Sequence, residues 1–382
     1  MTNLGNMEKR QYQQRAIDFL TKTRRGIVQA PAGAGKTHIA ASALAVCLSR
    51  RQGVAAVEIM VNTKEQVDQM QTACDRFPVI QEKANLRIYC AAGAPMGTAP
   101  DLLIVDECHR AGADGWAKKI KQTNSARWGL SATPFNDDPA RNNLLRNMFG
   151  NKIHSIDRSE LVESGHLAKA SVVWHSIESN GTKALIKCNA QALIDSRRKR
   201  LGWMFKDPES AKKQINQCKW QAAQKHGIWE NQERDKCIAE LAKQSMDGGG
   251  HVIVLIGSID HGKSLLHLIP GAELMHSKLG NKKRADIIER FRNGNLKCMV
   301  GTSAIEEGFD APIADVIIMA GCGRSERKAI QATGRVLRPH NGKQRGVIHE
   351  FMDKNDSMLL WQSRARQRIY QQLNYSQICI DM

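Results

Sequence analysis

A glycine-rich loop near the start of the 382-residue chain has the composition of a phosphate-binding loop. It reads Ala30-Pro31-Ala32-Gly33-Ala34-Gly35-Lys36-Thr37, and it lies between the apolar pair Ile27-Val28 and an apolar pattern of helical period. Glycines let the backbone approach a phosphate closely, and the amide groups at a helix start supply positive potential. We expect Lys36 to neutralise the β- and γ-phosphates of ATP and Thr37 to ligate Mg²⁺. The nucleotide-binding residues expected in this loop are Ala32, Gly33, Ala34, Gly35, Lys36 and Thr37.

Two adjacent carboxylates, Asp106 and Glu107, follow the apolar run 102–105 and come 70 residues after Lys36. Ligands of parallel α/β sheets bind at the carboxyl ends of the strands, where this pair would lie. Asp106 can hold Mg²⁺, and Glu107 can orient and deprotonate the attacking water. Adjacent acids in a turn are commonly no more than solvated charges, so the assignment depends on the phosphate loop that precedes them.

A third group of polar residues is Ser131-Ala132-Thr133-Pro134, which follows the short apolar stretch 128–130. Its hydroxyl groups can couple a nucleotide site to a moving lobe. The same residues also suit a simple turn closed by Pro134. The residues alone leave both readings open.

Two further stretches that could take part in the chemistry lie about two hundred residues later, in 301–310 and 331–339. Arg335 and Arg338 are three positions apart and share one face of a helix. Planar guanidinium groups are well suited to stabilise charge on a γ-phosphate in transfer. The alternative is a basic surface face, which a strongly basic chain would also produce.

The elements that must position these residues are short apolar runs separated by helical patterns. Before residue 180 these runs are 26–28, 57–61, 102–105 and 172–174; after residue 250 they are 252–256, 298–300 and 316–319. Unbroken apolar runs are typical of parallel strands buried on both faces. The fold class expected is therefore α/β, with two lobes that each contain a mainly parallel sheet flanked by helices.

Four domains follow from this pattern. We predict a first lobe in residues 1–175, a basic helical connecting segment in 176–247, a second lobe in 248–356 and a basic helical tail in 357–382. The glycine triplet 248–250 would be the turn into the second lobe.

The charge balance favours a polyanionic partner. The chain has 56 Lys and Arg against 38 Asp and Glu, for a formal net charge of +18. Such a charge attracts nucleic acid over a distance. No apolar run is long enough to cross a membrane, so we expect no membrane partner and an intracellular protein. The ten cysteines contain no C-x-x-C pair, and we expect isolated thiols packed in the core.

Residues 197–229 combine cations with tryptophans, and two interpretations remain open for them. The run 197–200 is Arg-Arg-Lys-Arg, and Trp203, Trp220 and Trp229 lie among further lysines. Cations with aromatic rings suit a surface that follows a nucleic-acid backbone and stacks on bases. Tryptophans at helical spacing also pack commonly against a neighbouring domain, and we expect packing to dominate for them.

The motifs together resemble those of superfamily-2 helicases, in the order that the family has them. Arg10, Tyr12 and Gln13 resemble its adenine-reading element, 30–37 motif I, 106–109 (Asp-Glu-Cys-His) motif II, and 131–133 motif III. Residues 302–310 resemble motif V, and 331–338 resemble motif VI. The resemblance covers about residues 8 to 350 and is most specific for RadD and type III restriction motor proteins of bacteria and phages, which act mainly on DNA.

The resemblance implies two RecA-like lobes with ATP and Mg²⁺ held between them. It adds Arg10, Tyr12, Gln13, Gly308 and Asp310 to the expected nucleotide-binding residues, and it makes the catalytic set Lys36, Asp106, Glu107, Gln331, Arg335 and Arg338. The chain departs from the family in two places. Only 44 residues separate Val61 from Asp106, without a T-x-Q-like element, and 61–66 resembles motif Ia without its proline.

The function expected is an ATP-dependent helicase or translocase acting on nucleic acid, with DNA preferred and RNA also open. We expect a monomer in the cytoplasm of a bacterial or phage-infected cell. The alternative is a nucleotide-gated clamp, or an RNA helicase, that does not unwind DNA processively. A nucleotide kinase would share the phosphate loop, but it would not explain Asp106, Glu107, the second lobe or the charge.

Overall fold

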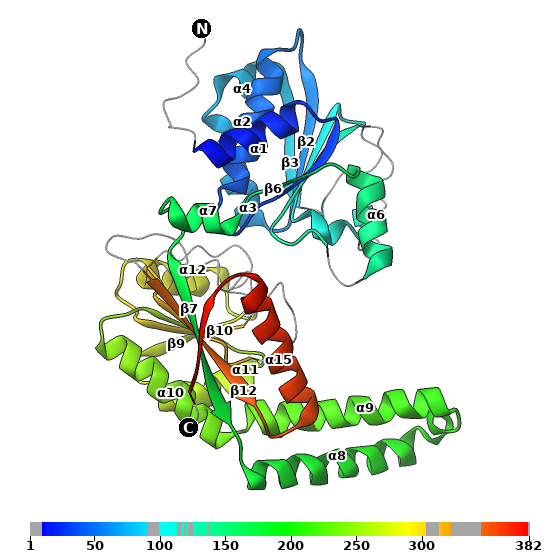
Figure 1. Ribbon diagram of the computed structural model, residues 1–382, viewed down its shortest axis with the longest axis vertical. Coiled ribbons are helices and arrows are strands. Elements are labelled where there is room, and N and C mark those ends of the chain that lie inside the picture. The colour runs from blue at the N-terminus through cyan, green and yellow to red at the C-terminus, as the bar shows by residue number, and fades with distance from the viewer. Residues whose placement is uncertain are drawn as a thin grey trace. The chain divides into compact units, whose positions relative to one another are not determined.

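The computed structural model describes residues 10–90, 93, 99–112, 116–117, 120, 125–135, 138–302, 313–321 and 345–380. The chain divides into two compact units, Met1–Leu167 and Ala168–Met382. Each unit is built on a parallel sheet with helices around it (Figure 1). The predicted fold class is confirmed.

The first unit contains a six-stranded sheet in the order β3-β2-β4-β5-β1-β6. The strands are β1 (Arg25–Gln29), β2 (Ala55–Val61), β3 (Ala84–Cys90), β4 (Leu102–Asp106), β5 (Ala126–Ser131) and β6 (Ile153–Ser155). All of their pairings are parallel, so the carboxyl ends of β1, β4 and β5 lie at one edge. The register pairs Gln29 with Ser131 and Asp106 with Leu130 at that edge.

The described helices of the first unit are α1 (Gln11–Thr21), α2 (Lys36–Ser49), α3 (Lys64–Asp75), α4 (Pro78–Lys83), α6 (Pro139–Phe149) and α7 (Arg158–Glu163). Of these, α3, α6 and α7 begin at the side-chain caps Thr63, Asp138 and Asp157. The start of α3 is a capping box, in which Thr63 accepts from the Gln66 amide and the Gln66 side chain accepts from the Thr63 amide. The residues that resemble motif Ia therefore serve first to begin a helix.

The second unit contains a seven-stranded parallel sheet in the order β13-β7-β12-β11-β8-β10-β9. The strands are β7 (Lys169–Ile177), β8 (Val252–Leu255), β9 (Ala272–Met275), β10 (Cys298–Gly301), β11 (Val316–Ile318), β12 (Arg345–Asp353) and β13 (Ser376–Ile380). Helices α11 (Ile259–Leu268), α12 (Asn281–Arg292) and α15 (Ser357–Gln372) accompany them.

Two expected domain boundaries need correction. Strand β7 contains the apolar run 172–174 that we expected in the first lobe, but it pairs with β12 and β13, so the boundary lies after Leu167 rather than after residue 175. An apolar run predicts a buried strand without identifying its sheet, since both neighbours of β7 lie near the other end of the chain. The tail is likewise not wholly helical, because β13 follows α15 and extends the sheet.

The basic middle segment is helical and belongs to the second unit. Helices α8 (Asn180–Arg200) and α9 (Pro208–Gln224) form a long hairpin joined by the 3₁₀ turn η3 (Gly202–Phe205) (Figure 1). A π-helical turn, η4 (Lys225–Trp229), leads into α10 (Gln232–Asp247). Among the helices that the structure describes, none combines the length and hydrophobicity that a membrane span requires.

The cysteines are only partly core residues, contrary to expectation. Cys74, Cys108, Cys218, Cys237 and Cys298 are buried, whereas Cys188 and Cys379 are exposed. Cys188 lies on α8 and Cys379 on the edge strand β13, and both side chains are exposed to solvent.

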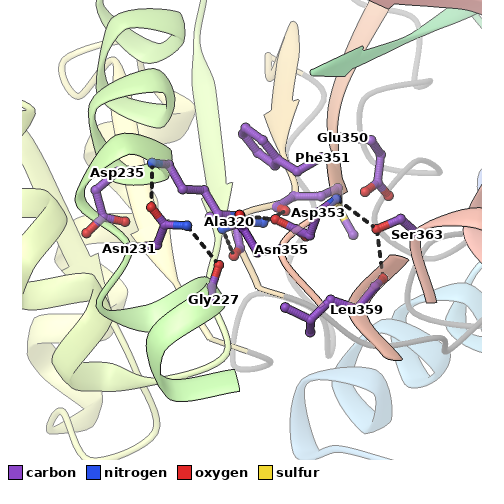
Figure 2. A network of polar contacts seen from close by, with 12 residues as sticks. Gly227, Asn231, Asp235, Ala320, Glu350, Phe351, Asp353, Asn355, Leu359 and Ser363 are labelled. Carbon is purple, nitrogen blue, oxygen red and sulfur yellow. Dashed lines mark hydrogen bonds and ion pairs between the residues drawn. The ribbon is translucent and has the colours of Figure 1, made fainter. Parts of the chain in front are cut away.

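A buried arginine on α10 fixes the carboxyl ends of two strands in the second unit. Arg234 is fully buried and donates from Nε to Asp353 Oδ1 at 3.0 Å and from Nη1 to the Ala320 carbonyl at 2.6 Å. Its guanidinium group also lies 4.3 Å from the ring centre of Phe351. Figure 2 shows Ala320, Phe351 and Asp353 close together at these strand ends. Asp353 ends β12, and Ala320 follows β11, so one side chain ties α10 to both strand ends.

We expect Arg234→Met to lower the free energy of unfolding of the second unit by about 3–5 kcal/mol, because it leaves Asp353 charged, buried and without this partner. Urea unfolding followed by far-UV circular dichroism would measure the change. The control is the double variant Arg234→Met with Asp353→Leu, which should recover part of the loss. A double variant whose losses simply add would contradict a coupled buried pair.

Candidate nucleotide site

The phosphate loop has the backbone conformation that its glycines predict. Gly33 and Gly35 have φ of 89° and 81°, in the left-handed region that disfavours other residues. Gly35 is the N-cap of α2, and Lys36 is the first residue of that helix. A Cβ at Gly35 would lie 2.7 Å from Gln13 Nε2, so a side chain there would also displace the Gln13 amide that contacts the loop.

The expected adenine-reading residues lie beside this loop on α1. Gln13 is buried and donates from Nε2 to the Ala34 carbonyl at 3.2 Å. Arg10 Nη1 donates to the Tyr12 hydroxyl at 3.1 Å. The Tyr12 ring is buried, and its centre lies 5.7 Å from that of His166. Gln13 thus contacts the loop directly, while Arg10 and Tyr12 contact each other.

The two carboxylates lie at the end of β4 and face the loop lysine. Asp106 is 7% exposed, and Glu107 has φ of 49°, which is strained for a residue with a side chain. The Lys36 Nζ lies 3.8 Å from Glu107 Oε1. The first-unit residues predicted to perform the chemistry therefore meet at one edge of the sheet.

A close approach between β5 and the turn after β4 supports this geometry. Cys108 is fully buried, and a Cβ at Gly129 would lie 2.9 Å from its Sγ atom. Phe149 would lie 3.2 Å from the same added atom. Only glycine at position 129 leaves room for the turn that carries Asp106 and Glu107.

Burial and neighbouring charge act in opposite directions on the two carboxylates. Burial and the negative charge of Glu107 raise the pKa of Asp106 to about 6, and Lys36 only partly offsets this. Burial would raise the pKa of Glu107 as well, but the Lys36 ammonium and the His109 contact lower it to about 2. Glu107 is accordingly the residue that carries the negative charge, and Asp106 takes up the proton of the pair more readily.

A histidine and a serine extend the site toward β5. His109 Nδ1 lies 2.9 Å from Ser131 Oγ and 3.2 Å from Glu107 Oε2. Because a carboxylate only accepts, we assign the proton to Nδ1. The Thr133 amide donates to Ser131 Oγ at 3.2 Å. Residues 131–133 therefore connect to the acidic pair through His109, a contact that their sequence spacing did not predict.

The residues present fit a magnesium ion bound mainly through phosphate and water. Asp106 supplies a carboxylate and Thr37, the second residue of α2, supplies a hydroxyl group. Within the described residues, no group of three or more His, Cys, Asp or Glu side chains forms a metal site. Mg²⁺ commonly keeps several waters and binds through one or two protein ligands together with substrate phosphates, so two ligands suffice.

The remaining predicted site residues, Gly308, Asp310, Gln331, Arg335 and Arg338, lie outside the described residues. His166 is a residue that the sequence did not single out for the site. It approaches Tyr12 from the turn after α7, more than 150 residues along the chain, and no local spacing could have linked them.

Two family models match the chain, one on each unit. The type III restriction enzyme res subunit matches residues 6–96 and 93–136, and the helicase conserved C-terminal domain matches residues 240–340. These matches include the phosphate loop and the acidic pair in the first unit and the segments 303–310 and 331–338 in the second.

The chain is also similar to two named proteins and to one solved structure. "Putative helicase 22" of Sulfolobus islandicus filamentous virus is 25% identical over 92% of this chain and 66% of its own length. The "DNA 3'-5' translocase XPB2" of Sulfurisphaera tokodaii is 23% identical over 87% of this chain and 79% of its own length. The solved structure of "ATP-dependent Type ISP restriction-modification enzyme LlaBIII bound to DNA" superimposes with a TM-score of 0.66 at 15% identity, which is a likeness of fold. It covers 98% of this chain, which spans 31% of that protein.

We expect Asp106→Asn to raise the thermal unfolding midpoint of the ligand-free chain by a few degrees at about pH 8. Because the pKa of Asp106 in the folded state is raised to about 6, its ionised form destabilises the fold above that pH. The wild-type chain regains this stability as pH falls from about 6 toward the ordinary carboxyl pKa of 3.8, so the advantage of asparagine should be clearly smaller at about pH 5 than at pH 8.

Circular dichroism melts without Mg²⁺ or nucleotide would measure both midpoints. Asp68→Asn, on the exposed face of α3, is the matched control and should change neither midpoint. An equal gain for Asp106→Asn at both pH values would contradict the electrostatic explanation.

Proposed function

We propose that this chain, an ATP-hydrolysing helicase of superfamily-2 type, uses ATP hydrolysis to translocate along or remodel nucleic acid, with DNA preferred. The observation that carries this proposal is the meeting of Lys36 with Glu107 at 3.8 Å, beside the buried carboxyl group of Asp106. A binding protein that does not hydrolyse ATP has no need for an acidic pair beside its phosphate loop.

Lys36 has two partners in this scheme. In the ligand-free chain its ammonium group lies against Glu107 and holds the pKa of that carboxyl group down, at about 2. A phosphate bound in the loop would draw Lys36 toward its own negative charge. Glu107 would then lose its main stabilising cation, its proton affinity would rise, and it could accept a proton from the attacking water. His109 would keep Glu107 oriented during this change.

The other roles follow from residue chemistry and from the family resemblance. Asp106 and Thr37 would hold Mg²⁺, which when bound neutralises charge on the phosphate oxygens. The backbone of 32–35 would cradle the phosphates, and Arg10, Tyr12 and Gln13 would face the base. We assign Gln331, Arg335 and Arg338 to the γ-phosphate during hydrolysis, and Gly308 and Asp310 to nucleotide binding.

DNA is the preferred substrate in this proposal for two reasons. The net charge of +18 suits a polyanion, and the printed names of similar proteins include a DNA translocase and a restriction enzyme bound to DNA. ATP and DNA occur together in the cytoplasm of a bacterial or phage-infected cell, so we place the protein there, acting as a monomer.

We expect Lys36→Ala and Glu107→Gln each to lower nucleic-acid-stimulated ATPase by at least about 100-fold, because each removes a charge aligned with the reacting phosphate or water. Phosphate release measured with saturating single-stranded DNA would show the loss. DNA binding without nucleotide should change little in both variants. Lys22→Ala, an exposed lysine at the end of α1, is the control. Hydrolysis at the wild-type rate in either site variant would falsify the assignment.

The substrate is tested separately by comparing ATPase rates with single-stranded DNA, duplex DNA, branched DNA and RNA. Salt must be the same in all four assays, because phosphate contacts weaken steeply as salt rises. Stimulation by RNA without stimulation by DNA would overturn the DNA preference while leaving the ATPase assignment intact. Strand-displacement assays on forked duplexes would then separate unwinding from translocation alone.

A further inference from the structure

The end of the helical hairpin carries a concentration of positive charge. We define the hairpin tip as residues 197–213, which comprise the end of α8, the turn η3 and the start of α9. It contains seven Lys or Arg residues against two carboxylates, so a net charge of +5 lies in 17 residues of a chain whose total is +18. One of the two carboxylates, Asp207, serves as the N-cap of α9. The tip is therefore much more basic than the chain as a whole.

The base of the hairpin is held rigidly by the rest of the second unit. Ile186 and Ala190 of α8 pack with Ala222 and Ala223 of α9, with Ile228 of η4 and with Leu359 of α15. Trp220 and Trp229 pack against this cluster, so these two tryptophans have the structural role that was expected. The tip lies roughly 20 Å from Ile186 along α8, at about 1.5 Å per residue.

Arg197 connects the two helices close to the tip. It donates from Nη1 to Gln214 at 3.1 Å and to Gln217 at 2.8 Å, and from Nη2 to Gln221 at 3.3 Å. Its donors are thus used to fix α8 against α9. The remaining six cations of the tip form no ion pair within the described part of the chain; they are Arg198, Lys199, Arg200, Lys206, Lys212 and Lys213.

Trp203 differs from the two packed tryptophans. It lies in η3 at the tip and is 69% exposed, the largest exposure among the large hydrophobic side chains described. The neighbouring Phe205 is half-buried beneath Arg198, whose guanidinium carbon lies 5.4 Å from its ring centre. Exposure of an indole ring to water forgoes the free energy that its burial would contribute. An exposed ring among cations is therefore suited to bind a ligand that has an aromatic face.

We propose that the hairpin tip binds an unpaired nucleic-acid strand, with Trp203 stacked on a base and the six cations contacting the flanking phosphates. This inference rests on the proposed function, since it names a contact with the nucleic acid on which the enzyme acts. A base inside a duplex has both faces covered by its neighbours, whereas an unpaired base offers a face for stacking. Phosphates lie on both sides of every base, which matches cations placed around one exposed ring.

Trp203→Ala should weaken binding of a short poly-dT strand by about 5- to 100-fold, the range expected when one base–aromatic stack is removed. Trp203→Phe should retain most of the affinity, because phenylalanine keeps a stacking face. Binding of a blunt duplex should respond much less to Trp203→Ala. Lys199→Ala with Arg200→Ala should reduce the slope of log affinity against log salt by about 1.4 for the single strand, because each phosphate that a cation neutralises contributes about 0.7 to that slope.

The experiment is fluorescence anisotropy of labelled poly-dT, poly-U and blunt duplex with the full-length protein, without nucleotide, across a salt series. The matched controls are Trp361→Ala, a 49% exposed tryptophan on α15, and the double variant Lys187→Ala with Lys243→Ala, two exposed lysines remote from the tip. Circular dichroism melts would verify that each variant is folded. Wild-type affinity in Trp203→Ala, or an unchanged salt slope in the Lys199 and Arg200 variant, would overturn the proposal. An equal loss in the controls would overturn it as well.

Failure of this inference can be told apart from failure of the proposed function. Binding is measured without ATP, and the Trp203→Ala effect should be equally large when it is introduced into the Lys36→Ala variant. If the chain fails to hydrolyse ATP but binds the single strand more weakly with Trp203→Ala, the result would support strand binding by the hairpin tip and reject the proposed ATP-driven function. A chain that hydrolyses ATP in the presence of DNA, but whose single-strand affinity is unchanged by Trp203→Ala, would support the proposed function and reject the role of the hairpin tip.

Discussion

The first unit depends on one electrostatic arrangement, in which a single ammonium group faces two adjacent carboxyl groups, one buried and one partly buried. Asp106 and Glu107 repel each other at the end of β4, and burial removes the water that would weaken this repulsion. Lys36, whose Nζ lies 3.8 Å from Glu107, offsets part of the cost, but it does so from the start of α2 after the phosphate loop rather than from the same turn. The loop and the strand end must therefore be held at a fixed separation for the arrangement to persist.

Glycine positions and strand order provide that fixed separation. Strand β5 lies between β1 and β4, and Gly129 lets the turn after β4 pack directly on β5. Gly35 gives the phosphate loop its left-handed turn and leaves space for Gln13, which holds the loop through the Ala34 carbonyl. The strained φ of Glu107 persists because its neighbours Cys108 and His109 are both held by β5. The geometry of the site is thus a consequence of how closely three parallel strands approach one another.

The sequence predicted the local parts of this arrangement well and the distant parts poorly. The phosphate loop and the acidic pair could be identified because each is a short pattern whose chemistry is contained in neighbouring residues. The sheet to which β7 belongs could not be identified, because its partners β12 and β13 come from the last forty residues of the chain. The contact between His109 and Ser131 was not foreseen either, because it depends on the pairing of the neighbouring strands β4 and β5 and not on local spacing. The role of Arg234 was also missed, since it reaches two strand ends more than 80 residues away.

The three tryptophans of residues 197–229 have similar sequence surroundings but differ in their packing. Trp220 and Trp229 cover the apolar cluster at the base, where α8, α9 and α15 meet. Trp203 lies beyond the last residues that this cluster can reach, so no described element of the second unit covers it. Arg197 donates its hydrogen bonds to glutamines of α9. The other six cations of the hairpin tip are therefore the ones that face solvent or a ligand. A rigid base with an uncovered aromatic tip is the arrangement expected of a surface that meets another molecule, because an indole ring with only a structural role gains its stability where other side chains cover it.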